Sequence, residues 1–194
     1  VIDDAIPVEH QEIIERLVLS DNFGWIFNPT CAYAVGDIEK YNFEPEFFKN
    51  SVDTPLFAHA AWTQHGRNSA FFNMFIPVLD AIPYGISHLA RLKINMTLPT
   101  KETGPDTHSI PHVDYHSDDQ LLTALYYIND SDGDTYIFNE FEPYTGPLTL
   151  NRRVSPKRGR LVLFKCGRFH AGNNPSTNQP RLTLNANFYP TAKQ

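Results

Sequence analysis

Two stretches of the chain, Arg91–Leu98 and Arg181–Phe188, alternate strictly between polar and apolar residues. Side chains alternate across a β-strand, so each stretch, as a strand, has one polar face and one apolar face. The polar positions are Arg91, Lys93, Asn95 and Thr97 in the first stretch and Arg181, Thr183, Asn185 and Asn187 in the second. These faces fit either a half-buried sheet that meets bulk water or a barrel-like sheet that encloses a cavity. The second stretch has no acidic residue, which favours a cavity that binds an anion, with helices covering the apolar outer face.

From about residue 89 the chain consists of short apolar or alternating runs separated by turn residues, the pattern of an all-β region. The expected strands are Leu89–Leu98, Gln120–Ile128, Thr135–Phe138, Arg160–Cys166 and Arg181–Tyr189. Asn129–Asp134 and Pro156–Gly159 are the strongest turn signals between them.

Residues 1–88 mix helical and irregular patterns. Pro7 can open a helix that continues to Leu17. A second helix is expected over Ser69–Ile82, and a short aromatic strand over Phe23–Phe27. The residues of the second helix expected to face inward are Phe72, Phe75, Ile76 and Leu79.

Length and composition limit the classes of function. A chain of 194 residues is about one domain, here with residues 1–88 supporting a β core over 89–190. The net charge of −6 gives no electrostatic reason to expect a nucleic-acid partner. No apolar run approaches the roughly 18 residues of a membrane span, and Val1–Asp4 is not the start of a signal peptide. We therefore expect a cytoplasmic protein without a membrane partner, whose oligomeric state the sequence leaves open.

The cysteines, Cys31 and Cys166, lack the CxxC spacing of a zinc or redox site. Two reduced, buried thiols are the favoured interpretation, with a single disulfide as the alternative.

The segment Ser109–Ser117 contains His112 and Asp114 two residues apart, so on an extended strand both side chains point the same way. An imidazole and a carboxylate placed in this way can reach one metal ion. His170, which follows the expected strand Arg160–Cys166, is the natural third ligand. Two histidines and one carboxylate leave adjacent coordination positions open, as in non-heme iron(II) oxygenases.

An HxD pair and a distant histidine also arise by chance, as a surface His-Asp pair and a core histidine. What strengthens the metal hypothesis is Arg181, eleven residues after His170 on the polar face of the last strand, with Thr183 beside it. A guanidinium offers two parallel donors to a carboxylate.

At this point the sequence resembles the 2-oxoglutarate/iron(II)-dependent oxygenases, in particular their prolyl-4-hydroxylase-like branch. The likeness covers roughly residues 89–190, and its motifs stand in the family's order. They are His112-x-Asp114, Thr123–Asn129, Gly133–Phe138, His170 and Arg181. Residues 1–88 are more weakly similar to small members from marine phages and bacteria, so a phage-encoded protein acting in a host cytoplasm is one interpretation.

The resemblance implies a double-stranded β-helix, the jelly-roll or cupin-like barrel, within an α+β chain that is mainly β. It implies Fe(II) and O2, with 2-oxoglutarate as cosubstrate and ascorbate as a further candidate. Arg181 would bind the distal carboxylate of 2-oxoglutarate, with help from Thr183 and the Tyr127 hydroxyl, and Asn95 would lie near the cosubstrate.

The activity implied is hydroxylation of a C–H bond with release of succinate and CO2. A peptidyl-proline, an amino acid and another small metabolite all fit as substrates. The Gly133-Asp134-Thr135 phrase is one residue shorter than the family's Gly-Gly-Glu-Thr, which leaves the substrate open. Tyr115, His116 and Trp62 are candidates for the rim of the substrate site. Two alternatives remain: a cupin-like metal-binding protein without 2-oxoglutarate, and a non-catalytic interaction module on the same fold.

Overall fold

The computed structural model describes residues 1–33, 38–101, 104, 106–116 and 120–193. Its helical elements are α1 (Val8–Val18), η1 (Ile38–Tyr41), η2 (Pro45–Phe48), η3 (Phe72–Phe75) and α2 (Ile76–Asp80). Its strands are β1 (Ile26–Asn28), β2 (Leu56–Thr63), β3 (Gly66–Arg67), β4 (Gly85–Thr97), β5 (Leu122–Tyr127), β6 (Thr135–Phe141), β7 (Leu150–Val154), β8 (Leu161–Lys165), β9 (Arg168–Gly172) and β10 (Arg181–Thr191).

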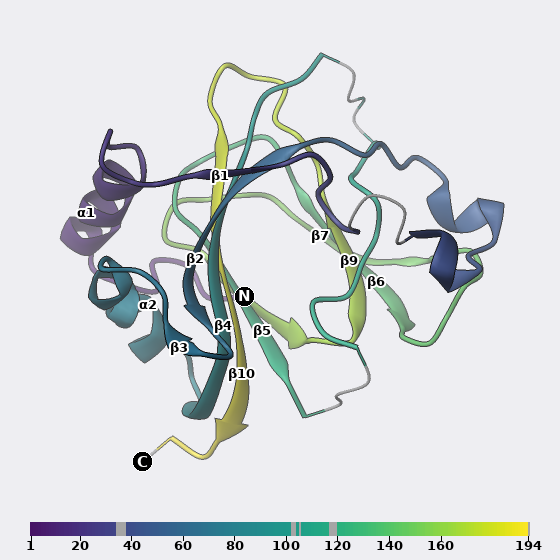
Figure 1. The fold of residues 1–194 in the computed structure, drawn as a ribbon. Helices are drawn as coiled ribbons and strands as arrows, with labels where there is room; N and C mark the ends of the chain where they lie inside the picture. Colours follow the sequence, from purple (N-terminus) through teal and green to yellow (C-terminus); the bar gives the residue numbers. More distant parts are fainter. Residues whose placement is uncertain (34–37, 102–103, 105, 117–119, 194) are drawn as a thin grey trace.

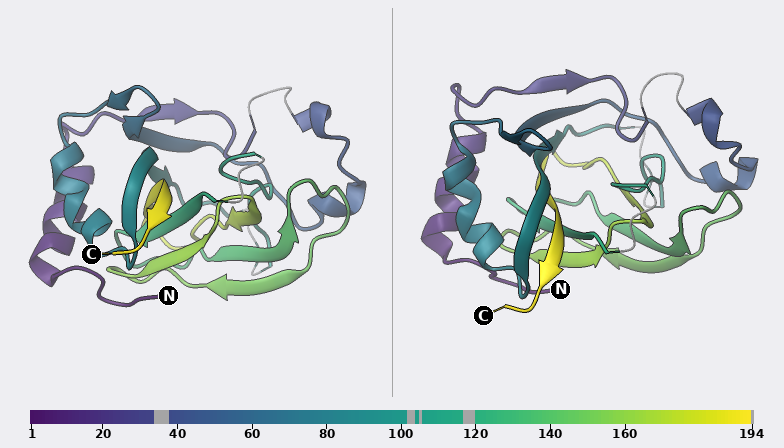
Figure 2. Two further views of the ribbon diagram at one scale, coloured as in Figure 1. Left: turned by 90° about the horizontal axis from the view of Figure 1, so that it is seen from below. Right: turned by 60° about the horizontal axis from the view of Figure 1, so that its bottom comes forward.

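The strands form two sheets. The larger has the order β1-β2-β4-β10-β5-β8, with β3 paired to β2, and the smaller has the order β7-β6-β9. Figure 1 shows the helices α1 and α2 on one side of the larger sheet and the smaller sheet on its other side. Figure 2 shows the same layering from two further directions, with α1 and α2 side by side and far from β6 and β7. This mainly β arrangement is the double-stranded β-helix that the sequence predicts.

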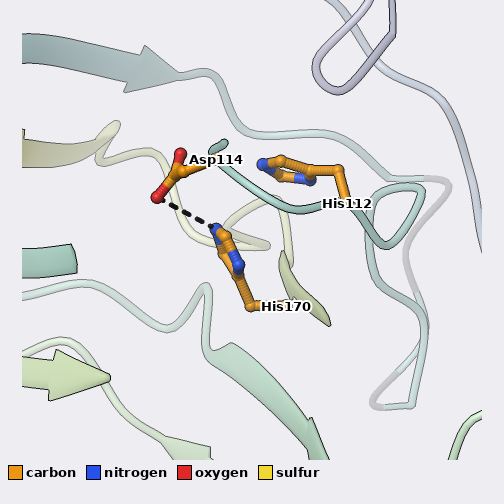
Figure 3. A group of neighbouring side chains, drawn as sticks. All are labelled: His112, Asp114 and His170. Atoms are coloured by element: carbon orange, nitrogen blue, oxygen red, sulfur yellow. Dashed lines mark ion pairs between the residues drawn. The ribbon is translucent and has the colours of Figure 1, made fainter. Parts of the chain in front are cut away.

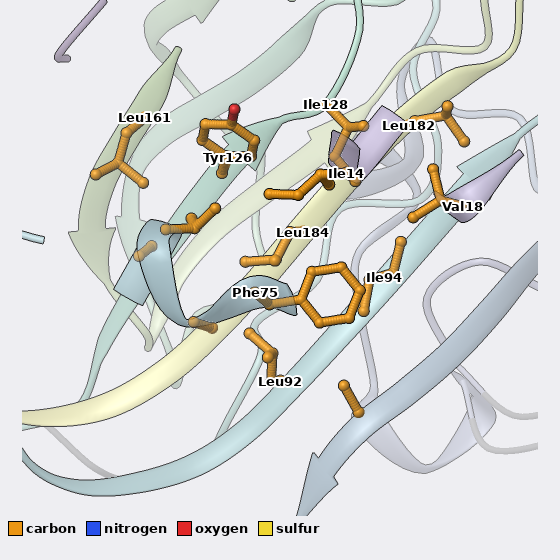
Figure 4. Packing of buried hydrophobic residues seen from close by; sticks show 14 of the residues in the cluster. Ile14, Val18, Phe75, Leu92, Ile94, Tyr126, Ile128, Leu161, Leu182 and Leu184 are labelled. Atoms are coloured by element: carbon orange, nitrogen blue, oxygen red, sulfur yellow. The ribbon is translucent and has the colours of Figure 1, made fainter. Parts of the chain in front are cut away.

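The long strands β4 and β10 pair antiparallel, with Arg181 opposite Thr97 and Asn187 opposite Arg91. Their apolar residues Leu92, Ile94, Leu182, Leu184, Ala186 and Phe188 are fully buried, at 0% exposure. They pack in one cluster with residues of α1 and α2, as Figure 4 shows. Their polar residues turn to the opposite side, where all of them except Asn187 line a cavity. The predicted orientation of both amphipathic strands is confirmed.

The first helix, α1, begins at Val8, directly after Pro7, as the sequence predicts. Its buried positions Gln11, Ile14 and Val18 recur at helical spacing and face the cluster. Gly159 has a φ of +80°, and an added Cβ there would lie 2.6 Å from Gln11, so the turn before β8 requires glycine. Within the described ranges no helix has the length and apolarity to span a bilayer.

The second predicted helix, Ser69–Ile82, is shorter and interrupted. A 3₁₀ turn covers Phe72–Phe75, and the α-helical part is only Ile76–Asp80. Pro77 has no N–H to donate to the preceding turn, so it fits the first turn of α2 but not the interior of a helix that begins at Ser69. Phe75 is fully buried as predicted, but Ile76 is 38% exposed and the prediction that it faces inward was wrong.

The aromatic strand predicted over Phe23–Phe27 begins later, at Ile26. Phe23 instead lies in a turn, where its N–H donates to Ser20 O, and its ring packs in the core beside Trp25 and His59. The helical and irregular prediction for residues 1–88 missed β2, which pairs directly with β4 and extends the larger sheet. The strands β7 and β9 of the smaller sheet were also missed.

Leu184→Ala should lower the free energy of unfolding by about 2–5 kcal/mol, because it removes a fully buried side chain from the contact between β10 and the helices. Urea unfolding followed by circular dichroism measures the change. Leu150→Ala on β7 is the matched control, since Leu150 is 52% exposed and the loss there should stay within about 0.5 kcal/mol. Equal losses in the two variants would contradict the packing described.

Candidate active site

Backbone pairing brings His112 and His170 together. The N–H of each donates to the carbonyl of the other over 3.0 Å, which makes the segment around His112 an antiparallel neighbour of β9. Directly opposed residues on antiparallel strands hold their side chains close on one face. The ring centroids of the two histidines are accordingly 4.6 Å apart.

Asp114 joins this pair from two residues further along the segment. Its Oδ2 lies 3.8 Å from His170 Nε2, and one ligand atom of each of the three residues lies within 4.8 Å of the others. Figure 3 shows the three side chains converging on one point. Two imidazoles and one carboxylate are a ligand set that suits iron(II) and leaves positions open for further ligands.

The Asp114 carboxylate is held by donors from three strands. Arg91 Nη2 donates to Oδ1 over 2.6 Å and Thr123 Oγ1 to Oδ2 over 2.8 Å. Asn187 Nδ2 lies 3.1 Å from Oδ2, and Asn185 Nδ2 lies 3.2 Å from both oxygens. Such partners orient a ligand and are part of a metal site's design. Strand alternation predicted the polar faces that carry Arg91, Asn185 and Asn187 but not their contacts with Asp114, and the contact from Thr123 was not predicted either.

The protonation states suit metal binding. Burial, together with the neighbouring His170, lowers the pKa of His112 to about 3, so its imidazole is neutral and free to coordinate at neutral pH. Burial raises the pKa of Asp114, but the charge of Arg91 and the hydrogen bond from Thr123 act in the opposite direction, and the net shift is downward. Asp114 is therefore a carboxylate under all ordinary conditions.

Arg181 is a buried cation, 7% exposed, at another part of the same cavity. Its Nε donates to Gly133 O and its Nη2 to Thr135 Oγ1, both over 2.7 Å. Both acceptors are neutral, and within the described ranges no carboxylate forms an ion pair with it. A buried charge without a counter-charge is costly. The site therefore fits an anionic ligand.

Tyr127 lies behind Arg181 and does not line the cavity. Its hydroxyl donates to Thr135 Oγ1 over 2.6 Å, and its ring centroid is 5.6 Å from the Arg181 guanidinium carbon. Tyr127 is therefore placed to support Thr135 and Arg181, and its contact with the cosubstrate stays a prediction. Thr183 and Asn95 do line the cavity, as predicted.

Of the three residues predicted at the rim of the substrate site, only His116 lines the cavity. His116 lines the cavity, is exposed, forms an ion pair with Glu142 and stacks on Tyr41. Tyr115 does not line the cavity, but its ring lies 5.5 Å from the guanidinium of Arg91. Trp62 was wrongly placed at the rim: it lies on β2 with its ring 5.0 Å from that of Phe72, packed against the core on the helix side of the sheet.

The cavity has a volume of about 270 Å³, and residues of β2, β4, β5, β6, β9, β10 and the segment 109–116 contribute to its walls. Both cysteines are free. Cys31 lines the cavity, and burial, with the nearby Asp53, raises its pKa to about 11. Cys166 Sγ lies 3.3 Å from Thr123 Oγ1 and 3.2 Å from Asn187 Nδ2, and burial raises the pKa of this thiol to about 12. Both are therefore neutral thiols.

Comparisons with known proteins agree with this geometry. Residues 98–189 match the family model described as the 2OG-Fe(II) oxygenase superfamily. Residues 98–189, which hold all three candidate ligands and Arg181, have the sequence pattern of this superfamily. Fe(II), 2-oxoglutarate and O2 are accordingly what it requires, and the His112, Asp114 and His170 set and the buried Arg181 fit the first two.

Solved structures share the fold of this oxygenase at low sequence identity. A Pseudomonas putida prolyl-4-hydroxylase is 14% identical with a TM-score of 0.51, covering 97% of this chain and 90% of its own. The alpha ketoglutarate-dependent epimerase SnoN from nogalamycin biosynthesis is 13% identical with a TM-score of 0.57, covering 97% of this chain and 77% of its own. Another SnoN structure is a complex with Fe3+, alpha ketoglutarate and nogalamycin RO. No curated protein sequence is significantly similar to this chain.

Arg181→Leu should raise the 2-oxoglutarate concentration needed for half-maximal uncoupled turnover by roughly 100-fold or more, about 2.7 kcal/mol, because the buried counter-charge is lost. Arg181→Lys keeps the positive charge but loses the two parallel N–H donors of the guanidinium, so it should weaken 2-oxoglutarate binding less than Arg181→Leu does. The measurement is succinate formation against 2-oxoglutarate concentration. Arg152→Leu, at an exposed arginine of β7, should leave the curve unchanged. An unchanged requirement in Arg181→Leu would remove Arg181 from the cosubstrate site.

Proposed function

We propose that this oxygenase is a prolyl-4-hydroxylase-like hydroxylase that oxidises a C–H bond of a peptidyl-proline, an amino acid or another small metabolite. The observation that carries the proposal is one cavity with two matched parts, a three-ligand metal set and a buried guanidinium that donates to neutral acceptors and forms no ion pair within the described residues. A bidentate 2-oxoacid with a second carboxylate needs both parts at once.

Each residue has a defined task in this proposal. His112, Asp114 and His170 hold the iron, and Arg181 holds the distal carboxylate of 2-oxoglutarate. With both bound, the site supplies the superfamily's oxidising chemistry, in which 2-oxoglutarate and O2 become succinate and CO2 as the substrate is hydroxylated. Thr123, Asn187 and Arg91 keep Asp114 ionised and oriented, and Thr135 with Tyr127 behind it fixes Arg181.

A second, largely apolar cavity of about 210 Å³ supports a substrate with an apolar ring. It shares Val113 and His116 with the metal cavity, so one molecule can extend from one cavity into the other. Its walls include Tyr33, Tyr41, Phe43, Tyr144 and Phe169. Aromatic walls of this kind suit the compact apolar pyrrolidine ring of proline as well as other apolar rings.

The two alternatives explain less of the site. A cupin-like metal-binding protein needs the three ligands but gives no reason for Arg181, which is buried against neutral acceptors only. A non-catalytic module needs neither a complete ligand set nor the hydrogen bonds that orient Asp114.

Asp114→Ala should abolish 2-oxoglutarate-dependent succinate formation and iron binding, because it removes the single anionic ligand of the set. The loss should exceed the roughly 10–100-fold effect that is typical when an outer partner of a metal ligand is removed, for which Thr123→Val is the comparison here. Asp21→Ala, at an exposed aspartate, is the matched control. Substantial iron-dependent turnover in Asp114→Ala would show that the ligand set is wrong.

A further inference from the structure

Lys93 is a cation in the active-site cavity to which the oxygenase chemistry described so far gives no task. It lies on β4 directly opposite Asn185 of β10, and Asn185 Nδ2 is 3.2 Å from both oxygens of Asp114. Lys93 therefore sits at the level of the metal ligands.

Lys93 forms no ion pair in the part of the chain that the structure describes, although the nearby carboxylate of Asp114 attracts its ammonium group. Arg91, two residues away on the same face, already forms the ion pair with Asp114. Burial and the charge of Arg91 lower the pKa of Lys93. This shift indicates that the ammonium group lies in poorly solvated surroundings close to another positive charge. Such a group is costly to keep unless a bound anion offsets it.

If the distal carboxylate of 2-oxoglutarate binds Arg181, it cannot also be the anion that offsets the charge of Lys93. Arg181 faces Thr97, whereas Lys93 faces Asn185, four residues further along β10. At about 3.3 Å per residue, the two positions are roughly 13 Å apart along the sheet. The cavity therefore has two separate cationic regions, one at Arg181 and one at Lys93 beside the metal ligands.

Two unpaired acceptors flank Lys93. Asn95 Oδ1 and Asn185 Oδ1 are buried and have no hydrogen-bond partner among the residues that the structure describes. Asn95 is two residues from Lys93 on the same face, and Asn185 is its partner across the strands. A buried acceptor without a donor is unfavourable, so a ligand that carries a donor group as well as a negative charge would satisfy this region.

We propose that Lys93 binds an anionic group, a carboxylate or a phosphate, of the substrate that is oxidised. The inference rests on the proposed function and narrows it. It favours a small acidic metabolite or a free amino acid over a peptidyl-proline, whose carboxyl group is locked in an amide. The cavity volume of about 270 Å³, which 2-oxoglutarate must share, agrees with a small substrate.

The test uses Mn(II) as the metal, with saturating 2-oxoglutarate, and two simple anions as probes. Paramagnetic broadening of the NMR signals of inorganic phosphate (31P) and acetate (13C) reports anions held near the metal. We expect saturable broadening of at least one probe, and the more affected probe identifies the anion class. Lys93→Met should weaken this binding about tenfold or more, while Lys93→Arg, which keeps the charge, should largely retain it. Lys165→Met, at an exposed lysine of β8, is the control.

A second readout separates the substrate from the cosubstrate. The 2-oxoglutarate requirement for uncoupled turnover should change less than about twofold in Lys93→Met, against the large change expected for Arg181→Leu. The proposal is overturned if neither anion is broadened in the unmodified protein, if broadening persists in Lys93→Met, or if that variant raises the 2-oxoglutarate requirement strongly. Failure of the proposed function looks different, because the unmodified protein would then form no succinate while the broadening experiment still reports on Lys93.

Discussion

The antiparallel pairing of β4 with β10 is the interaction on which the rest of this oxygenase depends. Because both strands alternate strictly, one pairing fixes two environments. The apolar faces are buried under α1 and α2, and the polar faces meet in the cavity. A slip of one residue in either strand would exchange these faces, placing Leu184 in the cavity and Asn185 against the helices. Burial of the core therefore also sets the register of the active site.

The cavity is organised by charge. At the metal end, the carboxylate of Asp114 is shared among Arg91, Thr123 and two asparagines, which leaves it ionised and oriented. Arg181 lies at a different level of β10, held by neutral acceptors and therefore available to an anion. This separation of a ligand set from a guanidinium suits a cosubstrate that carries a chelating group and a distant carboxylate.

Much of this organisation could be predicted from sequence, because strand alternation and residue chemistry are local. The faces of β4 and β10, the three ligands and Arg181 all followed from spacing and residue type. Contacts set by tertiary packing could not be predicted in this way. Tyr127 lies behind Thr135, Trp62 packs on Phe72, and β2 has weak alternation but gains its partner in β4. The break in the second helix could have been predicted from Pro77, because proline is disfavoured in the interior of a helix.

The most direct test of the account is the location of the metal and cosubstrate in a crystal grown without oxygen in the presence of Fe(II) and 2-oxoglutarate. Anomalous scattering at the iron edge locates the metal independently of the protein atoms. The account predicts one iron among His112, Asp114 and His170, with the distal carboxylate of 2-oxoglutarate paired with Arg181. Iron bound elsewhere, or that carboxylate on Lys93 with Arg181 unliganded, would contradict it.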